Sequence, residues 1–187
     1  QLGLAMHIYH DAYNCLPPAI VADKDGNPLY SGRVLLLPFM EQEALYEQFN
    51  KDEAWDSPAN LPLSQTDIPT FIDPSSAARK PGQTDFLFVV GKGTAFDPPE
   101  GYSGLAKIAD GTSNTVFMVD VRNSGISWAE PKDLDVSQPI SLPRGNHPGG
   151  NLAVFYDGHT SFIPQSVSAQ VIRILATCAG MEPTPNF

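Results

Sequence analysis

His147 and the Asp157–Gly158 pair are the residues of this 187-residue chain whose types and spacing most suggest chemistry. A histidine and a carboxylate together serve acid–base catalysis or metal ligation. Asp157–Gly158 also stands where a type I′ hairpin turn needs two positive φ angles, between alternating residues that predict strands. Ten extended residues span about 33 Å, so His147 and Asp157 meet only if the Gly149–Gly150 loop folds back. We therefore expect Asp157 to hold a turn and His147 to lock a loop by hydrogen bonding, with a metal role as the alternative.

The segment from Asp110 to Thr115, Asp-Gly-Thr-Ser-Asn-Thr, offers a second chemistry, because it is dense in the oxygen ligands that Ca²⁺ prefers. The side-chain ligands of a calcium site here would be Asp110, Thr112 and Asn114. Residues of these types equally bond to their own backbone and hold a turn. Three side chains fall short of the roughly six to eight oxygens that Ca²⁺ takes. We expect a loop held by its own hydrogen bonds, and calcium binding remains the alternative.

The remaining chemistry of the chain excludes several classes of protein. It has 21 acidic against 11 basic residues, and a net charge of −10 repels the phosphate backbone of nucleic acids. It contains no run of 18 apolar residues, no His-Glu-x-x-His or Cys-x-x-Cys motif, and no phosphate-binding loop. The sequence therefore predicts no enzyme and no cofactor.

The elements that must position these residues follow from hydrophobic periodicity. Leu2, Met6, Tyr9 and Tyr13 form an apolar stripe that predicts a helix over 2–14, with His7, His10 and Asp11 toward solvent. No capping residue precedes this stripe, so we expect the helix to continue upstream. The remaining expected elements are strands over 19–22 and 29–37, a helix over 40–49, strands over 86–90 and 115–121, the hairpin around 157–158, and a helix over 167–178 ended by Gly180. A helix followed by antiparallel strands is an α+β order, in one domain over residues 1–187.

Several blocks of the chain resemble a large bacterial family of prepilin-type, pilin-like envelope proteins. The signature is a histidine, nine residues and Asp-Gly, which here are His147, Asp157 and Gly158 with Gly149 and Gly150 between them. Blocks at 35–46, 68–75, 110–115, 127–131 and 177–182 follow in the family's order. The chain departs from the family pattern at three positions: Asp73 stands for a usual cysteine, Gly32 for a frequent tryptophan and Met181 for a glycine.

The resemblance implies a pilin-like fold, with a helix packed on an antiparallel sheet and a hydrophobic membrane helix upstream of Gln1. It implies a globular head at the extracellular face of the cell envelope, anchored through this upstream helix. Through the same helix the protein would assemble with like subunits or other pilin-like proteins into a filament or secretion apparatus. The alternative function is an extracellular solute-binding module, which needs a pocket of several hundred cubic ångströms. Cys15 and Cys178, the two cysteines, are an even number for an envelope protein. A disulfide between them and two separate buried thiols are equally open.

Overall fold

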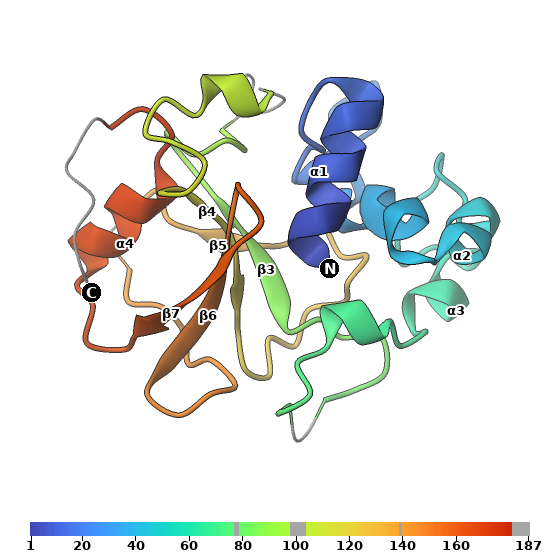
Figure 1. Ribbon diagram of the computed structural model, residues 1–187. Coiled ribbons are helices and arrows are strands. Elements are labelled where there is room, and N and C mark those ends of the chain that lie inside the picture. The colour runs from blue at the N-terminus through green and yellow to red at the C-terminus, as the bar shows by residue number, and fades with distance from the viewer. Residues whose placement is uncertain (77–78, 98–103, 139, 181–187) are drawn as a thin grey trace.

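The computed structural model describes residues 1–76, 79–97, 104–138 and 140–180 (Figure 1). Its elements have the α+β order that the sequence predicts, with a helix first, a meandering sheet next and a helix last. Gly101–Ser103 and Met181–Phe187 lie outside the described residues, and with them the end of the 177–182 block. Among the residues described, no helix combines the length and the apolar character needed to cross a membrane.

A five-stranded sheet forms the centre of the structure, in the order β5-β3-β4-β6-β7. Its strands are β3 (Phe86–Val90), β4 (Val116–Asp120), β5 (Leu134–Asp135), β6 (Gly150–Phe155) and β7 (Thr160–Pro164). All neighbours pair antiparallel except β5, which runs parallel to β3 at the edge. All five residues of β4 are buried, because apolar layers cover both faces of the sheet.

The two terminal helices lie on opposite sides of this sheet (Figure 1). On one side, α1 (Leu2–Tyr13) packs into the larger apolar cluster, which includes Phe88 and Phe117 of the central strands. On the other side, α4 (Ala169–Ala176) packs into a second cluster. Ser168 caps α4 by accepting the N–H of Val171. The helix ends at Ala176, not at Gly180 as predicted, and its C-cap Thr177 is extended.

The buried face of α1 matches the predicted stripe only in part. Leu2, Met6 and Tyr9 are buried, and Asp11 is exposed, as expected. Tyr13 is 58% exposed, which corrects the prediction that it faces the sheet. His10 is half-buried, and its Nε2 accepts the N–H of Leu105 at 3.3 Å, so it does not simply face solvent.

A two-stranded hairpin, β1 (Ile20–Ala22) with β2 (Pro28–Ser31), follows α1. The predicted strand over 29–37 stops at Ser31, because a 3-10 helix, η1 (Gly32–Met40), follows directly. Gly32 begins η1 so close to the hairpin that an added Cβ would lie 1.7 Å from the Pro18 carbonyl oxygen. This backbone contact leaves no room for the tryptophan frequent in the family that the chain resembles.

Within the described residues, short helices complete the connections between these elements. The predicted helix over 40–49 is shorter in the structure, as α2 (Glu43–Gln48). The stretch over 51–83, for which the sequence predicts no helix or strand, contains α3 (Leu61–Ser64) and η2 (Pro69–Phe71). A single 3-10 turn, η3 (Leu105–Lys107), lies beside α1.

Candidate functional site

His147 lies in the loop before β6 and contacts a residue that its sequence neighbourhood does not suggest. Its Nε2 is 3.1 Å from Oδ2 of Asp73, whose side chain is 2% exposed. Asp73 follows η2, so the contact joins two loops that lie 74 residues apart in the chain. His147 therefore pairs with Asp73, the position where the resembling family usually has cysteine, and Asp157 has a different partner.

Two more buried carboxylates, Asp85 and Asp120, lie around this pair. Oδ2 of Asp85 accepts the backbone N–H of Asp73 at 3.0 Å, and Oδ2 of Asp120 accepts that of Asn146 at 2.7 Å. Burial raises the pKa of both carboxyls, and the negative charge of Asp73 raises them further. The neighbouring His147 lowers the pKa of Asp120 and so partly offsets the effect of burial.

This arrangement acts as a hydrogen-bonded network that fixes loops at the ends of β3 and β4. Within the described ranges, no group of three or more His, Cys, Asp or Glu side chains has the geometry to hold a metal ion. A hollow of about 430 Å³ adjoins the network on its outer side. Arg122, Arg144 and Gln165 line it together with His147 and Gly149.

Asp157 and Gly158 form the turn between β6 and β7, but its type differs from the prediction. Gly158 has a φ of 89°, whereas Asp157 is not among the positive-φ residues, so the turn is not type I′. The Phe155 N–H bonds to the His159 carbonyl, which makes a three-residue loop with glycine in the left-handed position. Asp157 accepts the backbone N–H of His159 at 3.0 Å. An added Cβ on Gly3 of α1 would lie 2.8 Å from the Gly158 Cα, so the turn supports the first helix.

The loop over 110–115 lies beside the same turn. Asn114 donates its side-chain amide to the Asp110 carbonyl at 2.8 Å, and Oδ2 of Asp110 accepts the N–H of Gly180 at 2.7 Å. The Thr112 carbonyl accepts the N–H of Asp157 at 3.1 Å. One oxygen of the Asp110 carboxylate and the carbonyls of Asp110 and Thr112 are therefore engaged in hydrogen bonds with the protein.

Cys15 and Cys178 are free thiols in the structure, and both lie at the edge of the larger apolar cluster. Burial raises the pKa of Cys178 to about 12, and the charge of Asp110 adds to this rise. Such a thiol carries almost no thiolate at neutral pH, which makes it a poor nucleophile.

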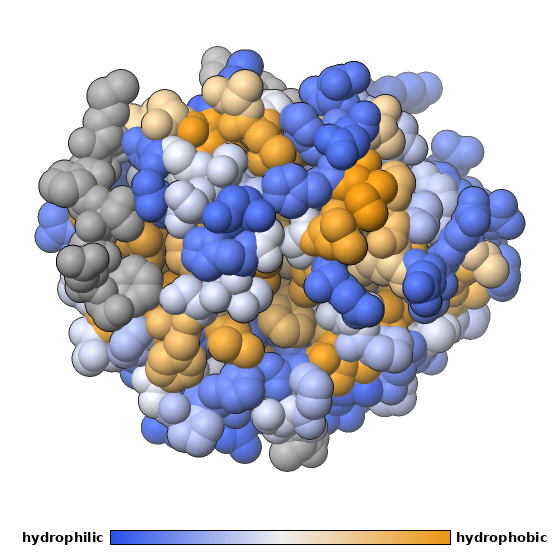
Figure 2. Space-filling view, viewed as in Figure 1, coloured by the Kyte–Doolittle hydropathy of each residue, from blue (hydrophilic) through white to orange (hydrophobic). Residues whose placement is uncertain are grey.

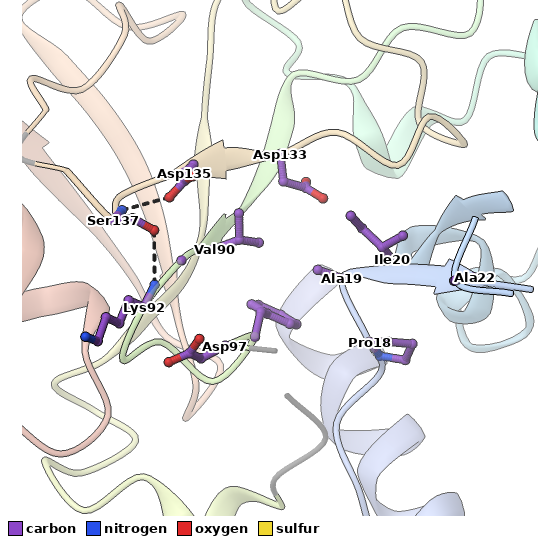
Figure 3. A pocket seen from close by; sticks show the side chains of 13 residues that line it. Pro18, Ala19, Ile20, Ala22, Val90, Lys92, Asp97, Asp133, Asp135 and Ser137 are labelled. Carbon is purple, nitrogen blue, oxygen red and sulfur yellow. Dashed lines mark hydrogen bonds between the residues drawn. The ribbon is translucent and has the colours of Figure 1, made fainter. Parts of the chain in front are cut away.

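A cavity of about 790 Å³ opens between the β1–β2 hairpin and the β3–β5 edge of the sheet (Figure 3). One wall is apolar and includes Pro18, Ile20, Val90 and Phe96. The polar lining comes mainly from the segments after β3 and around β5, and its charged members are Lys92, Asp97, Asp133 and Asp135. The volume falls in the range of small-molecule sites, and the mixture of a broad apolar wall with few polar groups is typical of them.

Asp133 lies in the cavity wall, and its carboxylate is held in place by several hydrogen bonds. Its side chain is 2% exposed, and its Oδ1 bonds both the Arg33 guanidinium and the N–H of Phe88. Arg33, itself fully buried, donates further to the carbonyls of Trp128 and Glu130. Burial raises the pKa of Asp133 to about 6, although the charge of Arg33 acts in the opposite direction. Its Oδ2 has no hydrogen-bond partner among the described residues.

Reasoning from the sequence missed both the buried carboxylates and this cavity. Asp73 and Asp85 each lie beside an apolar segment, which is an ordinary position for a residue at the end of a strand, whereas Asp120 lies inside the apolar run from Val116 to Val121. Arg33 gave a stronger signal, because it directly precedes the apolar run from Val34 to Met40, and a charge that is buried together with such a run needs a partner. The partner lies 100 residues away, and no local pattern identifies it.

Comparison with known proteins is consistent with this picture without adding an activity. Residues 1–103 match a family described as a protein of unknown function (DUF1559) and labelled SBP_bac_10. The chain belongs to this family. The match covers α1, the β1–β2 hairpin and β3, and thus the side of the cavity that carries the hairpin. No curated protein and no solved structure matches this DUF1559 chain.

Proposed function

We propose that this DUF1559 protein is a non-catalytic assembly subunit of the bacterial cell envelope, whose globular head packs against like subunits through α1. The observation that supports this function is the outer face of α1. Leu4 and Ile8, one helical turn apart, are 63% and 39% exposed, although the opposite face of the same helix is buried in the core. Hydrophobic side chains gather over the N-terminal half of α1 on the molecular surface (Figure 2).

A helix that is apolar on both sides normally has a second partner. Burying a leucine or isoleucine side chain contributes about 1.5–3 kcal/mol, so covering Leu4 and Ile8 in each subunit favours association. Lateral packing of like subunits supplies such a cover. The net charge of −10 on the chain keeps the remaining surface repulsive toward other copies and directs contact to this face.

In the proposed assembly the head stands at the extracellular face of the envelope. The hydrophobic helix that the pilin resemblance implies would anchor it and form the filament core. The filament or secretion apparatus would thus be held by helix packing, while the acidic head faces outward.

Sedimentation velocity of the chain over a range of concentrations tests this function. We expect concentration-dependent self-association that the double substitution Leu4→Gln and Ile8→Gln abolishes. Leu61→Gln is the matched control, because Leu61 is also 39% exposed but lies on α3. Association that is absent, or that the Leu61 variant weakens as much as the double variant, would contradict the proposal.

A second function, binding of an extracellular solute, is favoured by a different observation. The 790 Å³ cavity beside the β1–β2 hairpin is large enough for a small molecule and carries both an apolar wall and polar groups. The family label SBP_bac_10 agrees with solute binding. Ligand titration followed by NMR, described below, tests this function independently of self-association.

A further inference from the structure

The wall of the cavity between the β1–β2 hairpin and the β3–β5 edge contains a buried hydrogen-bond acceptor that has no donor among the described residues. Oδ2 of Asp133 is buried and has no donor within the described part of the chain. Leaving a buried acceptor unpaired destabilises the protein, and more so when the acceptor is charged. The carboxylate points toward Ile20 across the space that separates the sheet edge from the hairpin (Figure 3). A ligand that donates a hydrogen bond here would relieve this cost.

The charges around the cavity indicate which kind of hydrogen-bond donor a ligand would carry. The lining holds three aspartates, Asp97, Asp133 and Asp135, against one lysine. Figure 3 shows Lys92 directed away from the space between Val90 and Ile20. Arg33 bonds Asp133 and three backbone carbonyls, so its guanidinium has little capacity left for an anion. The site therefore disfavours anions and favours a cation.

The apolar lining of the cavity indicates what the remainder of the ligand is like. Ile20, Val90 and Phe96 provide an apolar wall next to the carboxylate. A strongly hydrated metal ion gains nothing from such a wall, and no metal-binding cluster occurs in the described ranges. An organic ammonium carries up to three donors on one nitrogen and buries its carbon skeleton against the apolar side.

We propose that this cavity binds small molecules with a primary ammonium group on an apolar body, with Asp133 as the acceptor of the ammonium. The inference rests on the solute-binding function proposed above and goes beyond the assembly function. Asp97 and Asp135 add long-range attraction from the side away from the hairpin. Each already accepts one backbone N–H, from Gly93 and Ser137, and keeps acceptor capacity.

Titration with three matched probes tests the ligand class: 3-phenylpropylamine, 3-phenylpropan-1-ol and 3-phenylpropanoate, each followed by ¹H–¹⁵N correlation spectra at pH 7. We expect the amine to bind about tenfold more tightly than the alcohol, because it adds charge-assisted hydrogen bonds, and the carboxylate to bind least. The largest shifts should fall on the amides of Gly91, Lys92 and Asp135. Equal binding of amine and alcohol would overturn the ammonium class and leave solute binding standing. No binding by any probe, or shifts centred elsewhere, would overturn the site itself.

Two variants connect the binding to the named residues. Asp133→Asn should reduce amine affinity about tenfold and bring it close to that of the alcohol. Because this variant leaves Arg33 without its anionic partner, Ala22→Trp provides a second test at the exposed end of β1. The indole should obstruct the cavity and abolish binding of the amine without changing any charge. Ala59→Trp, at an exposed alanine outside the lining, is the control. Amine binding that survives Ala22→Trp unchanged would contradict the proposal.

Discussion

Nε2 of His147 lies 3.1 Å from Oδ2 of Asp73, so the histidine before β6 holds a buried carboxylate from a loop 74 residues earlier. The side chain of Asp73 is 2% exposed and that of His147 is 36% exposed. This contact makes His147 a link between two loops, whereas Asp157 lies in the β6–β7 turn and bonds His159.

The first prediction is that His147→Ala lowers the free energy of unfolding by about 1–3 kcal/mol, because it leaves Asp73 without this partner. Urea unfolding followed by circular dichroism measures the loss. His159→Ala is the control, since His159 bonds a carboxylate in a pair that is partly exposed on both sides. Its cost should stay at or below about 1 kcal/mol. Equal losses of unfolding free energy in the two variants would show that the buried Asp73 does not depend on His147 for its stability.

Gly3→Ala gives the second prediction, because here helix propensity and packing act in opposite directions. Alanine is favoured over glycine by up to about 1 kcal/mol in a helix interior, and Gly3 is the second residue of α1. An alanine Cβ at position 3 would nevertheless lie 2.8 Å from the Gly158 Cα and 3.1 Å from its carbonyl oxygen, both of them backbone atoms. We expect a net loss of stability in thermal melts, because α1 must move away from the turn. A higher melting temperature for Gly3→Ala would show that the close approach of α1 to the Gly158 turn does not restrict the side chain at position 3.

The third prediction concerns pH and the buried Asp133. Its pKa in the folded protein is about 6, above the usual 3.8, so the folded state binds this proton more tightly than the unfolded state. The resulting stabilisation is complete below pH 3.8 and is lost as pH rises through about 6. The stability of the wild type relative to Asp133→Asn should therefore fall between pH 4 and 6. Asp85 and Asp120 shift in the same direction but are present in both proteins.

Asp67→Asn is the control for that pH series, because the pKa of Asp67 is shifted in the opposite direction to that of Asp133. The side-chain hydrogen bond from Arg79 lowers the pKa of Asp67 to about 2, so its contribution is present above pH 3.8 and lost as pH falls toward 2. The wild type relative to Asp67→Asn should gain stability as pH rises from 2 to 4. Urea unfolding at each pH measures both differences. A flat difference for Asp133→Asn between pH 4 and 6 would contradict the assigned shift.

The sequence predicted those elements whose signal is local. The strand β3 (Phe86–Val90) has the predicted bounds, because a short apolar run bounded by Gly91 leaves few alternatives. The apolar run after Ser31 has the composition of a strand as well. It forms η1 instead, because Gly32 packs its backbone against Pro18 and Arg33 turns inward to Asp133. Both contacts are tertiary, so periodicity could not reveal them.

The candidate site was predictable to a smaller extent. The sequence pointed to His147 but not to its partner, since Asp73 is distant in sequence and occupies a position that the resembling family usually gives to cysteine. The two-residue strand β5 has too little sequence to show any alternation, yet the residues beside it, Asp133 and Ser137, line the cavity. Charged residues inside or directly beside apolar runs, such as Asp120 and Arg33, are the feature from which such a site could have been sought.

The last prediction is that calcium leaves the stability of this chain unchanged. The loop over 110–115 already uses two of its acceptors to bond other parts of the protein: Oδ2 of Asp110 accepts the Gly180 N–H, and the Thr112 carbonyl accepts the Asp157 N–H. A calcium ion would have to displace these bonds and still find about six to eight oxygens. Specific binding to the folded state would raise the melting temperature once calcium exceeds its Kd. We therefore expect equal melting temperatures with calcium and with chelator, for the wild type and for Asp110→Ala. Asp11→Ala, at a side chain 85% exposed on α1, controls for general effects of removing a carboxylate. A rise with calcium that Asp110→Ala abolishes and Asp11→Ala retains would establish the calcium site instead.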